Sequence, residues 1–148
     1  MDMKKYLAYG ANMNLDTMSR RCPTAKFLGT GLLEDYRLMF KGEDVTTSYA
    51  TIEQWSGYAV PFVLWDLPPD AEKKLDRYEG YPIHYQKREV EIEFGGEKIS
   101  AMFYCKPEKQ RVYPPILHYY VALAESYETH GFDKKVLEEA FTFSDYRF

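Results

Sequence analysis

Residues 84–105 read HYQKREVEIEFGGEKISAMFYC, and their alternation predicts a β-hairpin. Apolar residues occupy every second position of the first strand at Val90, Ile92 and Phe94. The glutamates between them would form the solvated face of that strand. Gly95-Gly96 suits a tight turn, and the returning strand, 98–105, alternates in the same way. The hairpin therefore supplies two neighbouring antiparallel strands of a predicted β-sheet.

Four further strands are expected before the hairpin, because aromatic and aliphatic residues gather there between turn-forming residues. These strands cover Lys4–Tyr9, Lys26–Phe40, Ser48–Glu53 and Tyr58–Leu67. Residues 41–44 and the pair Ser56-Gly57 are the expected breaks between the last three.

Four helices are expected from capping residues and from apolar spacing near 3.6 residues. They extend from Asn14 to Arg21, from Asp70 to Gly80, from Pro114 to Gly131, and onward from Asp133. Asn14 and Asp70 are predicted N-caps, and Gly80 and Gly131 are predicted to stop their helices. Many strands followed by helices predict an α+β fold with a strongly curved, barrel-like mixed sheet and short helices, two of them near the C-terminus.

The composition narrows the class of protein. A length of 148 residues fits one domain, residues 1–148. Hydrophobic residues make up 45% and charged residues 28%, which argues against a disordered chain. The net charge of −4 gives no basic excess, so nucleic acid is not an expected partner. No segment approaches the ~20 apolar residues of a membrane-spanning helix, and the N-terminus lacks a secretory core. We therefore expect a cytoplasmic protein without a membrane partner.

The cysteines and histidines do not predict a metal site. Cys22 and Cys105 lie far apart in the sequence and are expected to be buried thiols. The chain has only three histidines and no Cys-x-x-Cys pair, so ligands at the spacing of a structural zinc site are lacking.

The first candidate site is the turn Tyr9-Gly10-Ala11-Asn12, which joins the first strand to the first helix. Its small residues allow backbone N–H groups to point into one concavity, a geometry that suits carboxylate or phosphate oxygens. The Asn12 side chain can both donate and accept hydrogen bonds. An ordinary strand-to-helix turn is the simpler explanation for four residues, so the residues alone leave both interpretations open.

The second candidate site is Glu79, at the end of the helix predicted before Gly80. Ala71, Leu75 and Tyr78 share its helical face, so Glu79 is expected on the core-facing stripe. Burial and the negative end of the helix dipole both disfavour a charged carboxylate and raise its pKa. A glutamate tuned in this way suits general acid/base chemistry, whereas a solvated helix-end carboxylate is the ordinary alternative.

Several segments together resemble the gamma-glutamylcyclotransferase-like family. Tyr9-Gly10-Ala11-Asn12-Met13 resembles its Tyr-Gly-Ser-Asn-Leu/Met motif, and Leu75 to Gly80, followed by His84-Tyr85 and Arg88 to Val90, resembles its Leu-Asp-x-x-Glu-Gly segment. Further similar segments are Ala50-Thr51-Ile52 and Pro114-Pro115 with Tyr119. Ala11 replaces the usual serine, and Ser126 stands where a glycine is common. The resemblance spans almost the whole chain in the family's order.

This resemblance implies an enzyme that cyclises an L-γ-glutamyl group to 5-oxoproline and releases an amino acid or amine, without a cofactor. It implies Glu79 as the general acid/base. It also implies substrate-binding roles for Tyr9, Gly10, Ala11, Asn12, Met13, Asn14, Tyr85 and Tyr119. The expected partner is thus a small γ-glutamyl compound. A non-catalytic binding domain of the same fold is the alternative. The sequence leaves open the choice of substrate, whether the first loop binds the α-carboxylate or the oxyanion, and whether the protein is a monomer or a homodimer.

Overall fold

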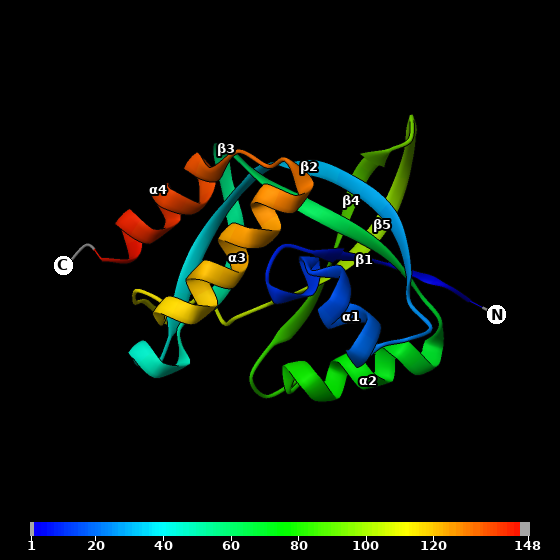
Figure 1. Ribbon diagram of the computed structural model, residues 1–148, viewed down its shortest axis with the longest axis horizontal. Coiled ribbons are helices and arrows are strands. Elements are labelled where there is room, and N and C mark those ends of the chain that lie inside the picture. Colours follow the sequence, from blue (N-terminus) through cyan, green and yellow to red (C-terminus); the bar gives the residue numbers. More distant parts are fainter. Residues whose placement is uncertain (1, 146–148) are drawn as a thin grey trace. The chain divides into compact units, whose positions relative to one another are not determined.

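The computed structural model describes residues 2–145 as six strands and four α-helices joined by short loops. The strands are β1 (Lys4–Ala8), β2 (Lys26–Gly42), β3 (Tyr49–Leu67), β4 (Gln86–Phe94), β5 (Glu97–Cys105) and β6 (Arg111–Val112). The helices are α1 (Leu15–Arg21), α2 (Pro69–Glu79), α3 (Leu117–His130) and α4 (Lys134–Ser144), with 3-10 turns η1 (Ala11–Met13) and η2 (Val45–Thr47). Figure 1 shows this arrangement.

The sheet has the strand order β4-β5-β1-β3-β2-β6. It is mixed, because β1 pairs with β5 in parallel and with β3 antiparallel. The predicted α+β class, with a curled mixed sheet and two helices near the C-terminus, is confirmed. The hairpin is confirmed as well: β4 pairs with β5 from Gln86↔Cys105 to Phe94↔Glu97. Its turn residues Gly95 and Gly96 have φ angles of 61° and 80°, values that favour glycine.

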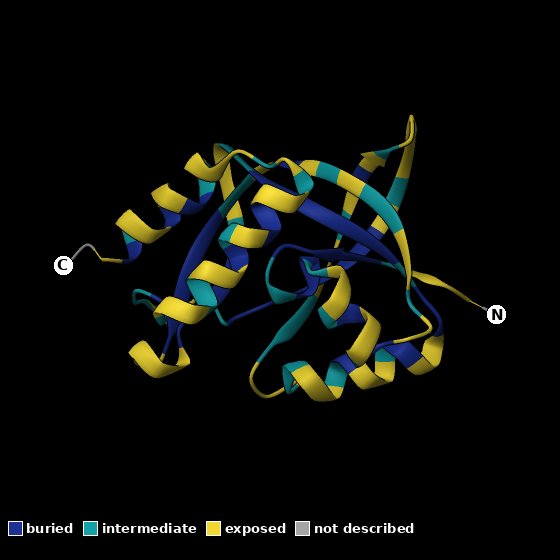
Figure 2. Cartoon of the chain, in the orientation of Figure 1, coloured by how far each residue is buried: buried dark blue, intermediate teal, exposed yellow. Residues whose placement is uncertain are grey.

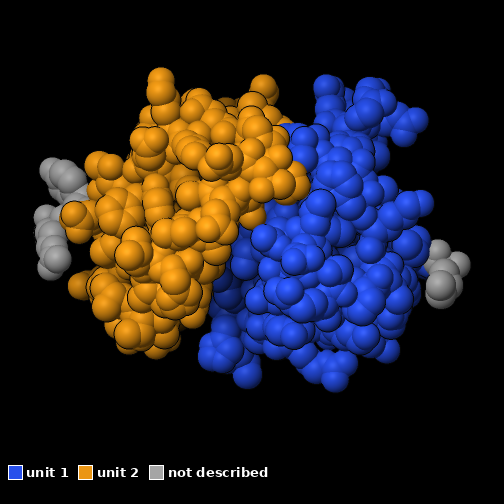
Figure 3. All heavy atoms as spheres, in the orientation of Figure 1, with its two compact units in different colours: residues 1–31, 62–105 blue, residues 32–61, 106–148 orange. Residues whose placement is uncertain are grey.

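The chain divides into two compact units, which Figure 3 colours separately. Unit 1 comprises residues 1–31 and 62–105, and unit 2 comprises residues 32–61 and 106–148. Each has its own core, and Figure 2 shows buried ribbon within both. Fully buried side chains include Leu7, Met18, Leu64 and Leu75 in unit 1, and Phe40, Leu123, Tyr127 and Leu137 in unit 2. The single domain stays a prediction, and Met1 and residues 146–148 of its span lie outside the described residues.

Helix α2 is built much as its sequence suggests. Pro69 occupies its first turn, where the missing N–H costs nothing. It ends at Gly80, whose φ of 66° is left-handed, and the Tyr81 N–H returns to the Asp76 carbonyl at 2.9 Å. A Cβ on Gly80 would lie 2.5 Å from the His84 ring, so this position also needs the absence of a side chain. The predicted stop is therefore confirmed.

Two local predictions about helices are wrong. Asp70 does not cap α2, because Pro68 is the N-cap residue and the Asp70 carboxylate accepts a hydrogen bond from Thr24 Oγ1 at 3.2 Å. Tyr78 does not join Ala71 and Leu75 in the core, since its residue is 61% exposed. Its ring instead lies beneath the Arg21 guanidinium, 4.8 Å from ring centroid to Cζ.

The predicted break at Ser56-Gly57 is also wrong, because β3 runs without interruption from Tyr49 to Leu67. Gly57 has a φ of 87°, which bends the strand and does not end it. Its N–H donates to Asp35 Oδ1 at 3.1 Å, and Asp35 in β2 itself has a φ of 62°. The Asp35 side chain thus satisfies the backbone N–H of Gly57, so a hydrogen bond joins the two irregular positions. Among residues 2–145, no helix is long and apolar enough to cross a membrane.

Candidate active site

Glu79 is the last residue of α2 and lies one turn beyond the fully buried Leu75. The residue is half-buried. Burial raises the pKa of its carboxyl to about 7, while the positive charge of Arg21 acts in the opposite direction. The shift has the predicted direction. A carboxyl group with this pKa can both take up and release a proton near neutral pH.

Hydrogen bonds fix both ends of the loop after β1. Tyr9, which is buried, donates its hydroxyl hydrogen to the carbonyl of Tyr104. The Gly10 carbonyl accepts from the N–H of Met13 at 3.0 Å, and Met13 is fully buried. Asn14 caps α1 as predicted, since its side chain accepts from the Thr17 N–H at 2.9 Å. Ala11 and Asn12 begin η1, where the first N–H groups have no acceptor within the turn.

Asn12 is the connecting residue of this loop. It is only 3% exposed, and its side chain forms a hydrogen bond at each end. Oδ1 accepts from Arg21 Nη1 at 2.8 Å, and Nδ2 donates to the Tyr6 hydroxyl at 3.0 Å. Its backbone carbonyl accepts from Trp65 Nε1 at 3.0 Å. The Asn12 side chain thus links α1 to β1.

Tyr6 connects this loop electrostatically to Glu79. Burial raises the pKa of the Tyr6 hydroxyl far above its usual value, and the charge of Glu79 raises it further. The ring of Tyr104 packs edge-on against that of Tyr6, with centroids 5.7 Å apart. Burial also raises the Tyr104 pKa, and the hydrogen bond to Asp76 adds to this. Tyr6, Asn12, Arg21 and Glu79 therefore belong to one neighbourhood within unit 1.

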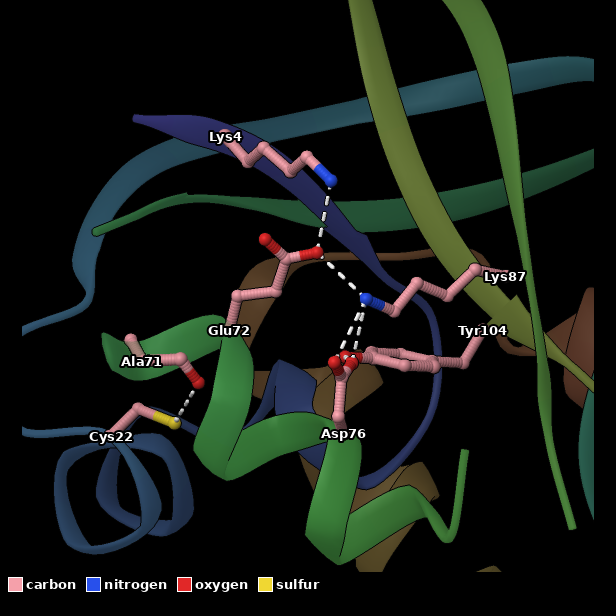
Figure 4. Close-up of polar contacts among 7 residues, drawn as sticks. All are labelled: Lys4, Cys22, Ala71, Glu72, Asp76, Lys87 and Tyr104. Atoms are coloured by element: carbon pink, nitrogen blue, oxygen red, sulfur yellow. Dashed lines mark hydrogen bonds and ion pairs between the residues drawn. The ribbon is translucent and has the colours of Figure 1, made fainter. Parts of the chain in front are cut away.

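A second group of charges holds α2 against the strands, as Figure 4 shows. Lys87 on β4 bridges Glu72 at 2.7 Å and Asp76 at 2.8 Å. Lys4 on β1 also reaches Glu72 at 3.0 Å, and the Tyr104 hydroxyl donates to Asp76 at 2.6 Å. We call these five residues the α2 anchor. Asp76 is half-buried within this group.

The remaining predicted site residues lie elsewhere. Tyr85 is half-buried in the connection between α2 and β4. Tyr119 stands in the first turn of α3, within unit 2, where its hydroxyl accepts from the Ala50 N–H at 3.1 Å. Its ring packs edge-on against Tyr49 at 5.2 Å. The substrate-binding roles of both tyrosines stay predictions.

Three residues near Glu79 were not singled out from the sequence: Tyr6, Arg21 and Tyr104. Tyr6 fits a strand pattern, and Arg21 fits the favourable charge of a helix end, so neither pattern signals a site. The contact between Tyr6 and Asn12 forms because the chain turns back on itself after β1, which the residue pattern alone does not indicate.

Cys22 and Cys105 are both buried, as predicted. Across residues 2–145, no three His, Cys, Asp or Glu side chains are grouped so that they could hold a metal ion.

Comparison with known proteins supports the resemblance. The family model described as "Gamma-glutamyl cyclotransferase, AIG2-like" matches residues 6–121. A solved structure titled "Gamma-glutamyl cyclotransferase" is similar with a TM-score of 0.82 and 24% identity, covering 94% of this chain and 86% of that one. An uncharacterized protein from Homo sapiens gives 0.81 and 24%, covering 95% and 87%. YkqA from Bacillus subtilis gives 0.79 and 20%, covering 98% and 55%. A search of curated proteins found no match. At these identities the solved structures show a shared fold.

Proposed function

The chain belongs to the gamma-glutamyl cyclotransferase, AIG2-like family, and we propose that it cyclises an L-γ-glutamyl group to 5-oxoproline with release of an amino acid or amine. The observation that carries this proposal is Glu79, a half-buried carboxyl group whose pKa burial raises to about 7. A single proton carrier of this kind meets the needs of the reaction.

The substrate supplies its own nucleophile. Its α-nitrogen attacks the γ-carbonyl carbon, the new C–N bond closes a five-membered ring, and the carbonyl electron pair moves onto oxygen. When that pair returns, the bond to the leaving nitrogen breaks. Overall, two protons leave the α-ammonium group, and the amine departs as an ammonium ion. Because the reaction is intramolecular, holding the substrate curled provides much of the rate enhancement.

In this proposal Glu79 carries the proton that moves while the ring closes. Its carboxylate accepts a proton from the attacking nitrogen and then gives it to the leaving nitrogen. A carboxyl group with a pKa of about 7 performs both transfers without a large energetic penalty. No covalent enzyme intermediate is required.

The proposed substrate contacts follow the predicted site residues. The loop Tyr9–Asn14 would hold the γ-glutamyl part through backbone N–H groups at the start of η1. Tyr85, also in unit 1, would contact the substrate as well, and the predicted role of Tyr119 as a substrate-contacting wall stays a prediction. We propose a small γ-glutamyl compound as the partner. The cytoplasmic location stays a prediction, and the choice between monomer and homodimer stays open.

The test is mass-spectrometric detection of 5-oxoproline after incubation of the purified protein with γ-glutamyl amino acids, γ-glutamyl amines and γ-glutamyl peptides. The Glu79→Gln protein, incubated in parallel, is the matched blank. We expect 5-oxoproline from at least one compound with the unaltered protein. Binding of these compounds without any 5-oxoproline would identify a non-catalytic binding domain and refute the proposal.

A further inference from the structure

The hydrogen bonds between Arg21, Asn12 and Tyr6 have a defined direction. A guanidinium group only donates, so the Asn12 atom that faces Arg21 Nη1 at 2.8 Å must be the amide oxygen. The amide nitrogen then faces the Tyr6 hydroxyl at 3.0 Å. Since an amide NH₂ only donates, the Tyr6 oxygen accepts this bond.

The hydroxyl hydrogen of Tyr6 is consequently left for another acceptor. Within the part of the chain that the structure describes, Asn12 is the hydrogen-bond partner of this hydroxyl. Tyr6 is only 4% exposed, and buried hydroxyl groups normally use their hydrogen. A hydroxyl held as an acceptor on one side is therefore ready to donate on the other.

The surroundings of Tyr6 keep this hydrogen in place. Burial and the charge of Glu79 on α2 hold its pKa far above neutral, and the hydrogen bond from Asn12 and the charge of Arg21 on α1 oppose them only in part. Tyr104 on β5 does not compete for this role, because its own hydroxyl donates to Asp76 at 2.6 Å. Tyr6 thus stays a neutral donor over the pH range in which Glu79 exchanges its proton.

We propose that Tyr6 is a further catalytic residue, whose hydroxyl donates a hydrogen bond to the γ-carbonyl oxygen of the substrate as that oxygen becomes an oxyanion. This inference rests on the proposed function. Tyr6 transfers no proton: the hydrogen stays on the tyrosine while the carbonyl electron pair moves to oxygen and returns. Asn12 and Arg21 are positioning residues that turn the Tyr6 hydroxyl toward the substrate.

The first variant removes the donor. Tyr6→Phe keeps the ring that packs against Tyr104, so the fold should persist. Loss of one oxyanion donor lowers kcat by about 10²–10³, and KM should change little because the bond is strongest in the transition state. The matched control is Tyr127→Phe, which removes a buried hydroxyl of unit 2 that has no hydrogen-bond partner among residues 2–145 and should leave kcat unchanged.

The second variant reverses the hydrogen bond and retains Tyr6. In Asn12→Asp, one carboxylate oxygen still accepts from Arg21, and the other must accept from Tyr6, which turns the Tyr6 hydrogen away from the substrate. We expect a loss of kcat similar to that of Tyr6→Phe. The double variant should be no slower than the slower single variant, because both changes remove the same bond.

The closing experiment is steady-state kinetics of 5-oxoproline release by the unaltered protein and all four variants, with folding verified by circular dichroism. An active protein in which folded Tyr6→Phe keeps a near-normal kcat would overturn this inference alone. Additive losses in the double variant would also overturn it. A protein that produces no 5-oxoproline from any γ-glutamyl compound would instead refute the proposed function and this inference with it. A ¹³C NMR titration adds a readout without substrate: the Glu79 pKa should be the same in Tyr6→Phe, whereas a clear rise would show that Tyr6 donates to Glu79.

Discussion

Helix α2 carries carboxylates in two contrasting surroundings, two turns apart. Glu72 accepts hydrogen bonds from Lys4 at 3.0 Å and from Lys87 at 2.7 Å. Burial raises the pKa of Glu72, but these lysines outweigh burial and lower the pKa overall. At Glu79, burial prevails over the charge of Arg21, and the pKa rises to about 7.

The difference lies in the partners, because both residues are glutamates on one helix. A carboxylate with two ammonium donors is fixed in its charged form and serves to attach the helix. A carboxyl group without such donors keeps both protonation states accessible and suits proton transfer. We therefore expect mutations in the α2 anchor to change mainly the stability, and mutations of Glu79 to change mainly the turnover.

The largest expected effect is on turnover. Glu79→Gln keeps the size of the side chain but removes the proton acceptor, so release of 5-oxoproline should fall by ~10²–10⁴. Glu72→Gln is the matched control, and turnover should stay within a few-fold because Glu72 serves the anchor. Initial rates at saturating substrate measure both. Equal losses in the two folded variants would remove the distinction between them.

The second expected effect is the pH dependence of the rate. Glu79 must be deprotonated to act as a base, and its pKa is raised to about 7. Below that pH, kcat/KM should rise about tenfold per pH unit, and it should level off above it. A rate profile from pH 5 to 9 measures this. A profile that is flat across pH 6 to 8 would assign proton transfer to another group.

The third expected effect is on the anchor. Lys87→Met leaves Glu72 and Asp76 without their shared cation, which should lower the free energy of unfolding by about 1–3 kcal/mol at pH 7. The loss should shrink in acid. A carboxyl group with a lowered folded pKa contributes stability above its unfolded pKa, and this contribution disappears as pH falls through the folded value.

The matched control for this change is Lys98→Met, on the same hairpin. Lys98 lies 3.9 Å from Glu91, and both side chains are exposed, so the pair should contribute under about 0.5 kcal/mol. Urea denaturation of both variants measures the difference. Equal destabilisation would show that the anchor behaves as an ordinary surface ion pair.

The smallest expected effect is an increase in stability, whereas most mutations lower the free energy of unfolding. The folded protein holds a proton on Glu79 between its unfolded pKa of 4.5 and its folded pKa of about 7, so stability falls as pH rises through that window. Glu79→Gln removes this loss and should be more stable than the unaltered protein at pH 8 by about 1–2 kcal/mol, since the carboxyl group is partly solvated. Thermal unfolding at pH 5 and pH 8 measures it, and a stability difference that does not change with pH would contradict it.

Local signals in the sequence predicted much of the fold. The alternation around Gly95-Gly96, the Asn14 cap and the stop at Gly80 each depend on neighbouring residues, and all three are confirmed. The continuity of β3 was missed because Gly57 is satisfied by Asp35, which lies 22 residues earlier. The prediction of an Asp70 cap was wrong because Pro68 is the N-cap residue and the Asp70 carboxylate accepts a hydrogen bond from Thr24.

The candidate site shows the same contrast between signals from neighbouring residues, which the sequence reveals, and contacts between distant residues, which it does not. Helical spacing and the helix end were enough to single out Glu79 and the direction of its pKa shift. The positions of Arg21 and Tyr6 around Asn12 depend on contacts between α1, η1 and β1, which no spacing rule reveals. The contacts of Asp76 are of the same kind, since Lys87 and Tyr104 come from strands that follow it in the sequence.

The way the two units share the chain offers a route to a smaller protein. Residues 32–61 leave and re-enter unit 1 at Gly31 and Phe62, and a Cβ on Gly31 would lie only 2.5 Å from the Phe62 ring. The two ends of that insertion are therefore already neighbours. Replacing it with a tight turn and stopping translation after Cys105 defines a miniature that retains Glu79, Tyr6 and Asn12 but lacks Tyr119. Such a gene would show whether the chemistry proposed for unit 1 requires unit 2.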